Sequence, residues 1–124
     1  MLLDSSAWVE FFQGSEKGKE VKLVLEQEES FTSIVTFSEI SQWCLRTDRK
    51  DLMICIEAVK RMSQVLVPTE LISVSAGKIN YERKKAGIKW GMLDSIIVAT
   101  SQVYGLNVLT IDNAFRDLPE AEVL

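Results

Sequence analysis

Three aspartates stand at the ends of apolar segments, and they constrain this chain more than any other feature. Asp94 interrupts a long apolar stretch, Asp4 ends the amino-terminal apolar run, and Asp112 closes a third run. Carboxylates are rarely buried unless they are paired or bind a metal. The three positions therefore predict a convergent acidic cluster. The chain has no histidine, so the ligands would be carboxylate, hydroxyl and water, which suit Mg²⁺ or Mn²⁺.

Length and composition limit the class of protein. The 124 residues correspond to one domain, residues 1–124, and 47% apolar residues supply a core. No apolar run reaches the ~20 residues of a membrane span. Apolar residues begin at Met1 without a preceding basic region, so we expect no signal peptide and a cytoplasmic protein. We expect Cys44 and Cys55 to be reduced core residues, and their spacing matches no zinc motif.

The net charge of −4 argues against a purely electrostatic nucleic-acid binder, which should be basic. If four carboxylates are assigned to metal ions, the rest of the chain is close to neutral. The basic clusters then become relevant to binding.

Short apolar segments alternate with amphipathic ones, which favours an α/β fold with a parallel sheet covered on both faces. We expect a three-layer α/β/α domain with a small sheet of four or five strands. The predicted strands are 1–3, 30–35, 65–67, 107–110 and, as a fifth, 122–124. The predicted helices are 5–13, 16–28, 36–47, 51–63, 69–85 and 95–104.

Four acids fall on one edge of this sheet. Ligands of parallel sheets bind beyond the carboxyl ends of the strands. Asp4 ends the first strand and Asp112 follows the fourth. Glu39 lies in the first helical turn after the second strand, and Asp94 enters from the start of the helix that leads into the fourth. We call these four residues the acid quartet.

Each acid also has a purely structural interpretation. Asp4 and Asp94 could cap the helices that begin after them. Glu39 completes Thr36-Phe37-Ser38-Glu39, which fits a capping box, and Asp112 could form an Asx turn. The coincidence of four such acids at one edge favours the cluster.

The pattern resembles the PIN domain family of metal-dependent ribonucleases. The resemblance rests on four segments in this order, and their spacing covers almost the whole chain. They are Leu2-Leu3-Asp4-Ser5-Ser6, Thr36-Phe37-Ser38-Glu39-Ile40, Leu93-Asp94-Ser95-Ile96-Ile97-Val98-Ala99-Thr100 and Leu109-Thr110-Ile111-Asp112-Asn113-Ala114-Phe115. The small size is similar to that of VapC-type toxins, which pair with a small antitoxin.

The resemblance implies metal-dependent endonucleolytic cleavage of RNA by the acid quartet, with Asp4, Asp94 and Asp112 as metal ligands. Ser6 and Thr110 match supporting hydroxyl positions. Many family members carry a further acid where this chain has Ala114. The resemblance also implies a homodimer and an antitoxin that covers the site.

We expect basic residues near the quartet to bind the phosphates of the RNA. They are Arg46, Arg83, Lys84, Lys85 and Lys89. The alternative is that they interact with helix carboxyl ends. Trp90 could stack on a base or belong to the core. Trp8, Phe11 and Phe12 could form core or a partner groove; together with Trp43 they suggest apolar surface for a second chain.

Two alternative functions are a phosphoryl-group chemistry on a similar sheet and a PIN-like module that only binds. A phosphoacceptor signalling domain would want adjacent acids after the first strand and a lysine after a late strand, and the chain offers neither. A phosphatase of the haloacid type needs Asp-x-Asp, which Ser6 breaks. A PIN-like module that binds RNA or protein without turnover is the second alternative.

Overall fold

Five short parallel strands form one sheet in the computed structural model, which describes residues 1–124. The order across the sheet is β3-β2-β1-β4-β5, so the first strand lies in the middle. The strands are β1 (Leu2–Leu3), β2 (Phe31–Ser33), β3 (Gln64–Leu66), β4 (Val108–Thr110) and β5 (Ala121–Val123). Leu2 pairs with Phe31 on one side and with Val108 on the other.

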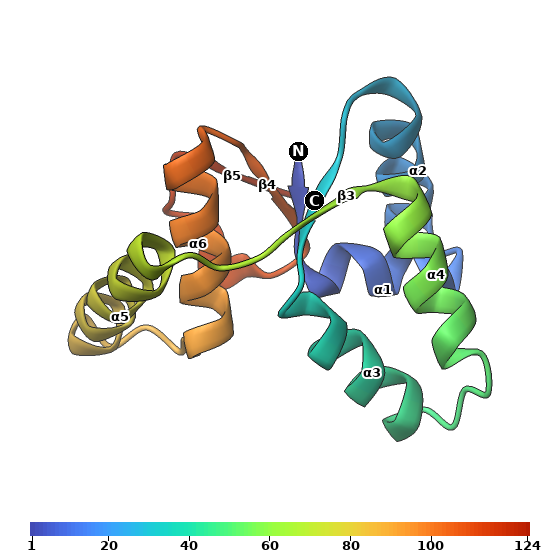
Figure 1. Cartoon of the computed structure of the whole chain (residues 1–124), viewed down its shortest axis with the longest axis horizontal. Coiled ribbons are helices and arrows are strands. Elements are labelled where there is room, and N and C mark those ends of the chain that lie inside the picture. The colour runs from blue at the N-terminus through green and yellow to red at the C-terminus, as the bar shows by residue number, and fades with distance from the viewer.

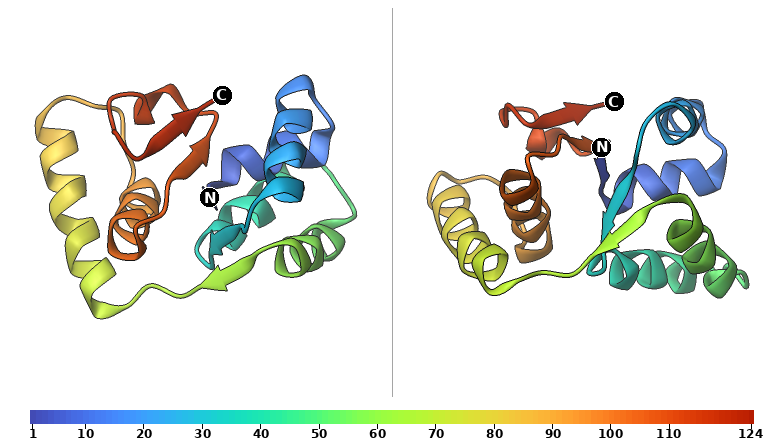
Figure 2. Two further views of the ribbon diagram at one scale, coloured as in Figure 1. Left: turned by 90° about the horizontal axis from the view of Figure 1, so that it is seen from above. Right: turned by 45° about the horizontal axis from the view of Figure 1, so that its top comes forward.

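Helices cover both faces of the sheet, which confirms the predicted three-layer α/β/α fold. Helices α1 to α4 lie on one side of the sheet, and α5 and α6 lie on the other (Figure 1). Two further views show the same separation (Figure 2). The helices are α1 (Ser5–Gln13), α2 (Glu16–Gln27), α3 (Thr36–Arg46), α4 (Leu52–Met62), α5 (Glu70–Lys85) and α6 (Met92–Tyr104).

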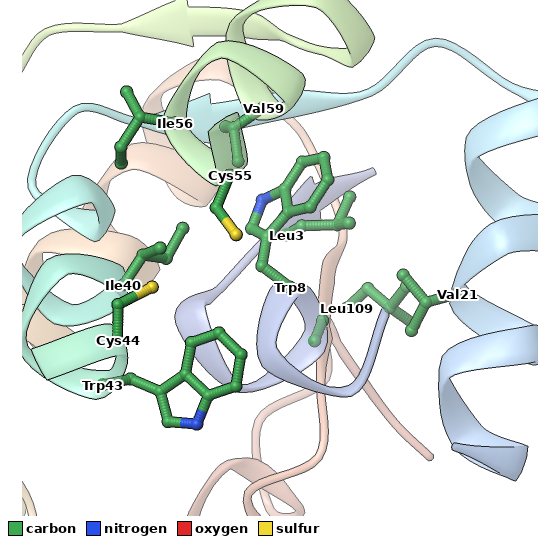
Figure 3. Close-up of a cluster of buried hydrophobic side chains, with 11 residues drawn as sticks. Leu3, Trp8, Val21, Ile40, Trp43, Cys44, Cys55, Ile56, Val59 and Leu109 are labelled. Atoms are coloured by element: carbon green, nitrogen blue, oxygen red, sulfur yellow. The ribbon is translucent and has the colours of Figure 1, made fainter. Parts of the chain in front are cut away.

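The central strand supplies both halves of the core because successive side chains of a strand point to opposite faces. Leu3 and Leu109 pack with Trp8 and Ile40 in a cluster under α1 to α4 (Figure 3). Leu2 packs in the opposite cluster, beside α6. Two strand residues thus anchor two helical layers, and the apolar start of the chain is buried on both faces.

The predicted boundaries are close, with one informative error. Helix α6 begins at Met92, three residues before the predicted start, so Asp94 lies inside its first turn. Gly91 is the N-cap residue, and the Asp94 carboxylate accepts a hydrogen bond from the Gly91 N–H. Asn113–Phe115 form a short 3₁₀ helix that the sequence pattern does not predict.

The aromatic residues belong mostly to the core. Trp8, Trp43 and Trp90 are buried, and Phe11 and Phe12 pack partly buried against the same cluster as Trp8. The suggestion that Trp8 and Trp43 offer apolar surface to a second chain is therefore wrong, and Trp90 is a core residue. The large apolar side chains that are exposed lie elsewhere, among them Leu45, Met53, Ile54, Val67, Leu71, Val74 and Tyr81.

No helix combines the length and the hydropathy that crossing a membrane requires.

Helix α2 crosses α1 so closely that only glycine fits at position 18. A Cβ atom on Gly18 would lie 2.0 Å from the backbone oxygen of Glu10. We predict that Gly18→Ala lowers the free energy of unfolding by about 1–3 kcal/mol, because backbone must move to relieve the overlap. This loss should exceed the gain of up to about 1 kcal/mol in helix propensity. Urea denaturation followed by circular dichroism measures the change.

Gly77 is the matched control, because it lies in α5 and a Cβ atom added there would have no other atom within 4 Å. Gly77→Ala should stabilise the protein by about 0.4–1 kcal/mol. Equal effects of the two substitutions would contradict the close crossing of α1 and α2.

Candidate active site

The sheet brings the acid quartet to its carboxyl edge. Asp4 follows β1, Asp112 follows β4, and Glu39 lies in the first turn of α3, directly after β2. Helix α6 runs against the strand direction, so its first turn, with Asp94, reaches the same edge (Figure 1). Four segments far apart in the sequence therefore contribute one acid each.

Asp4 is only 6% exposed, and its carboxylate accepts three hydrogen bonds. Its Oδ1 accepts hydrogen bonds from the Ser6 hydroxyl at 2.6 Å and from the Ala7 N–H at 3.1 Å. Its Oδ2 accepts one from the Thr110 hydroxyl at 2.6 Å. The two hydroxyls in turn accept the N–H groups of Ile111 and Asp112. Ser6 and Thr110 thus fix the orientation of the Asp4 carboxylate.

Burial raises the pKa of Asp4 to about 6. The hydrogen bonds from Ser6, Thr110 and Ala7 oppose this rise, and the charge of Asp94 adds to it. The pKa values of Glu39 and Asp94 are also raised, in both cases mainly by burial. Asp94 contributes to the rise at Glu39, and Asp112 contributes to the rise at Asp94. The four charges therefore lie close enough to repel one another.

Glu39 is not a capping residue, which corrects the capping-box interpretation. Val35 is the N-cap residue of α3 and makes no side-chain cap bond. Thr36 is the first helical residue, and its buried hydroxyl has no hydrogen-bond partner. The Oε1 atom of Glu39 instead accepts a hydrogen bond from the Ser5 hydroxyl at 3.1 Å. The carboxylate is thus directed to the segment after β1.

Asp4, Asp94 and Asp112 do cap local structure. Asp4 caps α1 through Ala7, Asp94 accepts the Gly91 N–H at 3.1 Å, and Asp112 accepts the Ala114 N–H at 2.9 Å. In Asp94 and in Asp112, only one carboxylate oxygen accepts the capping hydrogen bond. The other oxygen of each remains free for a ligand, so capping and clustering coexist.

Two hollows meet at Asp112. The first, about 420 Å³, contains Glu39 and continues past Ser5, Gln42 and Arg46. The second, about 460 Å³, contains Asp94 together with Lys89 and Trp90. Sequence reasoning missed Ser5 and Gln42. The signal for Gln42 was its position three residues after Glu39, on the same face of α3.

Arg83 differs from the other predicted phosphate-binding residues. The residue is 7% exposed, and its guanidinium pairs with both oxygens of Asp117 at 2.9 and 3.0 Å. It also donates to the Ala114 carbonyl and lies over the Trp90 ring, 4.1 Å from its centroid. Its two Nη groups are thus bound inside the protein and its Nε is buried without a partner, which argues against the predicted contact with RNA. Arg46, Lys84, Lys85 and Lys89 are exposed.

Family comparison agrees with this geometry. The model of the PIN domain family matches residues 1–121. The chain belongs to the PIN domain family. No curated protein matches this PIN domain by sequence.

Solved structures share the fold of this PIN domain at low sequence identity. A toxin–antitoxin complex from Klebsiella pneumoniae is 19% identical with a TM-score of 0.75, over 98% of this chain and 95% of that one. A VapBC complex of Rickettsia felis bound to a promoter DNA fragment is 12% identical with a TM-score of 0.78, over 99% and 97%. A sarcin–ricin loop cleaving VapC toxin of Mycobacterium tuberculosis is 15% identical with a TM-score of 0.77, over 95% and 94%.

The quartet suits a hydrated divalent cation better than a tight ligand cage. The four acids do not gather three ligand atoms within 4.8 Å of one another; the group that does lies elsewhere in this PIN domain. Mg²⁺ usually keeps several waters and takes only one or two carboxylates from the protein. Buried carboxylates that repel one another gain most from such a cation, since its charge offsets the cost of burial.

The pKa of Asp4 predicts how stability depends on pH. The folded protein binds the Asp4 proton more tightly than the unfolded chain, whose pKa is near 3.8. The contribution of Asp4 to the free energy of unfolding is therefore fully present below about pH 4. It is lost as the pH rises through about 6, and the free energy of unfolding falls by about 3 kcal/mol in total. Urea denaturation in EDTA between about pH 4 and 7 measures the loss.

The substitution Asp4→Asn should flatten this pH dependence, leaving the smaller contributions of Glu39 and Asp94. Glu122→Gln is the control, because Glu122 is exposed in β5 and should leave the curve unchanged. Superimposable curves for the parent and Asp4→Asn would contradict a buried, destabilised carboxylate.

Proposed function

We propose that this chain is a metal-dependent endoribonuclease and the toxin of a type II toxin–antitoxin pair. The observation that supports this most is the gathering of four carboxylates, three with raised pKa values, at the carboxyl edge of a PIN domain sheet. A structural role alone does not require four like charges at one edge, since their repulsion destabilises the fold.

Asp4, Asp94 and Asp112 would hold Mg²⁺ or Mn²⁺. The bound ion would activate a water molecule and offset charge on the phosphoryl oxygens, both of which phosphodiester hydrolysis needs. Ser6 and Thr110 keep the Asp4 carboxylate in one orientation, because each donates to a different oxygen. Asp112 is positioned by its turn, with the Ala114 N–H on Oδ1.

Glu39 would take the proton from the attacking water. The chain has no histidine for this step. Ser5 donates to Oε1 of Glu39, which leaves Oε2 without a hydrogen bond from the protein. Burial and the neighbouring acids raise the Glu39 pKa, and a base whose pKa lies closer to neutral pH accepts a proton more readily.

Basic residues on both sides of the quartet would bind the RNA backbone. Arg46 lines the hollow that contains Glu39, and Lys89 lines the hollow that contains Asp94. Lys84 and Lys85 are exposed side chains in the last turn of α5. An RNA strand bound across Asp112 would therefore have a basic side chain near the phosphates on each side of the cleaved bond.

The alternatives have less support. A PIN-like module that binds without turnover has no need for an intact quartet. A phosphoacceptor domain would want paired acids after β1, where Asp4 is followed by serines. The nuclease assay below separates turnover from binding.

Cleavage should depend on both the metal and the quartet. We predict that Asp4→Asn and Asp94→Asn each reduce Mg²⁺- or Mn²⁺-dependent RNA cleavage by about 100-fold or more. Several kcal/mol of charge stabilisation in the transition state are lost, and about 1.4 kcal/mol is a factor of ten. Gel analysis of a labelled RNA measures the rates, with Glu122→Gln as the matched acid-to-amide control. Undiminished cleavage in EDTA would rule out the mechanism.

Thermal melts of the same proteins show whether the variants fold. In Asp94→Asn the amide oxygen can still accept the Gly91 N–H, so the variant should keep this bond at the start of α6 while removing one repelling charge. In EDTA it should melt above the parent. Mg²⁺ or Mn²⁺ should raise the melting temperature of the parent by mass action, and less so that of the variant.

An antitoxin and a second copy of the chain are the proposed protein partners. The similar structures named above include toxin–antitoxin complexes. The antitoxin would cover the quartet and place a basic side chain among its charges. Exposed apolar side chains along α5, including Leu71, Val74 and Tyr81, support a protein contact.

We predict a homodimer at micromolar concentration in the absence of antitoxin. Multi-angle light scattering should give about twice the chain mass of 14.0 kDa. A strict monomer across the micromolar range would exclude the homodimer while leaving the nuclease proposal intact.

A further inference from the structure

Two buried thiols and a carboxylate meet where α3 turns into α4. Cys44 is fully buried in the last turn of α3, and Cys55 is 2% exposed in the first turn of α4. Both sulfur atoms point into the space between these helices (Figure 3). Asp51 precedes α4, and one ligand atom from each of the three residues lies within 4.8 Å of the others. None of the three lines the hollows of the acid quartet.

The turn between the helices is built tightly enough to hold this arrangement. The Arg49 N–H donates to the Cys44 carbonyl at 2.8 Å, and the Cys55 N–H donates to the Asp51 carbonyl at 2.9 Å. Asp48 adopts a left-handed conformation with φ of 56°, which reverses the chain. The backbone positions of all three groups are therefore fixed by local bonds.

Asp51 is oriented by a bidentate contact. Arg49 donates from Nε to Oδ1 at 2.9 Å and from Nη2 to Oδ2 at 2.8 Å. Its guanidinium also lies over the Trp43 ring, 4.8 Å from the centroid. Each carboxylate oxygen has a second lone pair, so Asp51 keeps the capacity to bind a cation.

We propose that Cys44, Asp51 and Cys55 form a structural site for a thiophilic divalent cation of the zinc class. Thiolate ligands select Zn²⁺ over Mg²⁺, so the site would not compete for the ion of the quartet. Zn–S bonds of about 2.3 Å at a tetrahedral angle place two sulfurs about 3.8 Å apart. The ligand atoms, already within 4.8 Å, need only small side-chain rotations to reach this geometry.

The local charges balance once the cation is bound. Two thiolates and a carboxylate exceed the charge of a divalent cation by one negative unit, and Arg49 supplies the compensating positive charge. The side chain of Asp51 is 36% exposed, so a water molecule can complete the tetrahedron. The two cysteines alone would not select a cation, whereas the oriented carboxylate supplies the third ligand.

A cation bound at this site would cross-link the end of α3 to the start of α4. Helix α3 also carries Glu39, Gln42 and Arg46, which line the first hollow. This cross-link would limit fraying of α3 and so keep the side chains that line the first hollow in place. The cation site itself does not depend on the proposed nuclease activity being correct.

Cobalt(II) is the probe for this site, because thiolate ligation gives it an intense charge-transfer absorption that oxygen ligands do not. The full chain, stripped of metal and kept reduced with a phosphine, should bind one Co²⁺ with this band and with strong visible bands typical of tetrahedral geometry. One equivalent of Zn²⁺ should abolish both, and excess Mg²⁺ should not. Absence of a charge-transfer band in the reduced protein overturns the site.

Variants assign the ligands. Cys44→Ser and Cys55→Ser should each weaken or remove the band, and Asp94→Asn should keep it. Asp51→Asn should fold, because Asp51 makes no side-chain cap bond to α4, and should weaken Co²⁺ binding at least about tenfold. Arg49→Gln should weaken it by about 10–100-fold through the lost orientation of Asp51. Unchanged affinity in Asp51→Asn, or a disulfide that forms while the reduced protein binds no Co²⁺, would each reject the proposal.

Discussion

The buried carboxylate of Asp4 is the interaction on which this edge of the protein depends. Burial disfavours its charge, and the Ser6 and Thr110 hydroxyls offset that cost by donating to different oxygens. The same hydroxyls accept N–H groups from the segment after β4. One charge therefore ties the start of α1 to the end of β4. The fold and the candidate site use the same bonds, so neither can change without the other.

Capping explains why the quartet is rigid rather than why it exists. Three of the acids hold a backbone N–H, which fixes their side chains beside one another at some electrostatic cost. Glu39 is the informative exception, because it is held by the Ser5 side chain and caps no helix end. An acid held by a side chain from another element is placed by tertiary structure. Its position is hard to explain by local helix stability.

The sequence predicted the alternation of strands and helices because apolar periodicity reports burial directly. It also placed the quartet at one edge, since that edge follows from parallel topology. It failed where the outcome depended on distant partners. Arg83 is buried because Asp117, 34 residues away, pairs with it. Asp51 approaches two cysteines through a turn whose geometry no spacing rule describes. The early start of α6 followed from a glycine cap, a weaker sequence signal than Ser or Asp.

Electrostatics couple the proposed metal and the proposed substrate. The chain carries a net charge of −4, and the quartet concentrates negative charge between Arg46 and Lys89. Without a cation, that edge repels a phosphodiester more strongly than two exposed basic side chains attract it. A bound divalent cation offsets two of the four negative charges, so the basic side chains attract the RNA against a weaker repulsion. In the proposed nuclease the metal is therefore required for binding as well as for chemistry, and the buried Arg83 does not substitute for it, because its charge is already paired with Asp117.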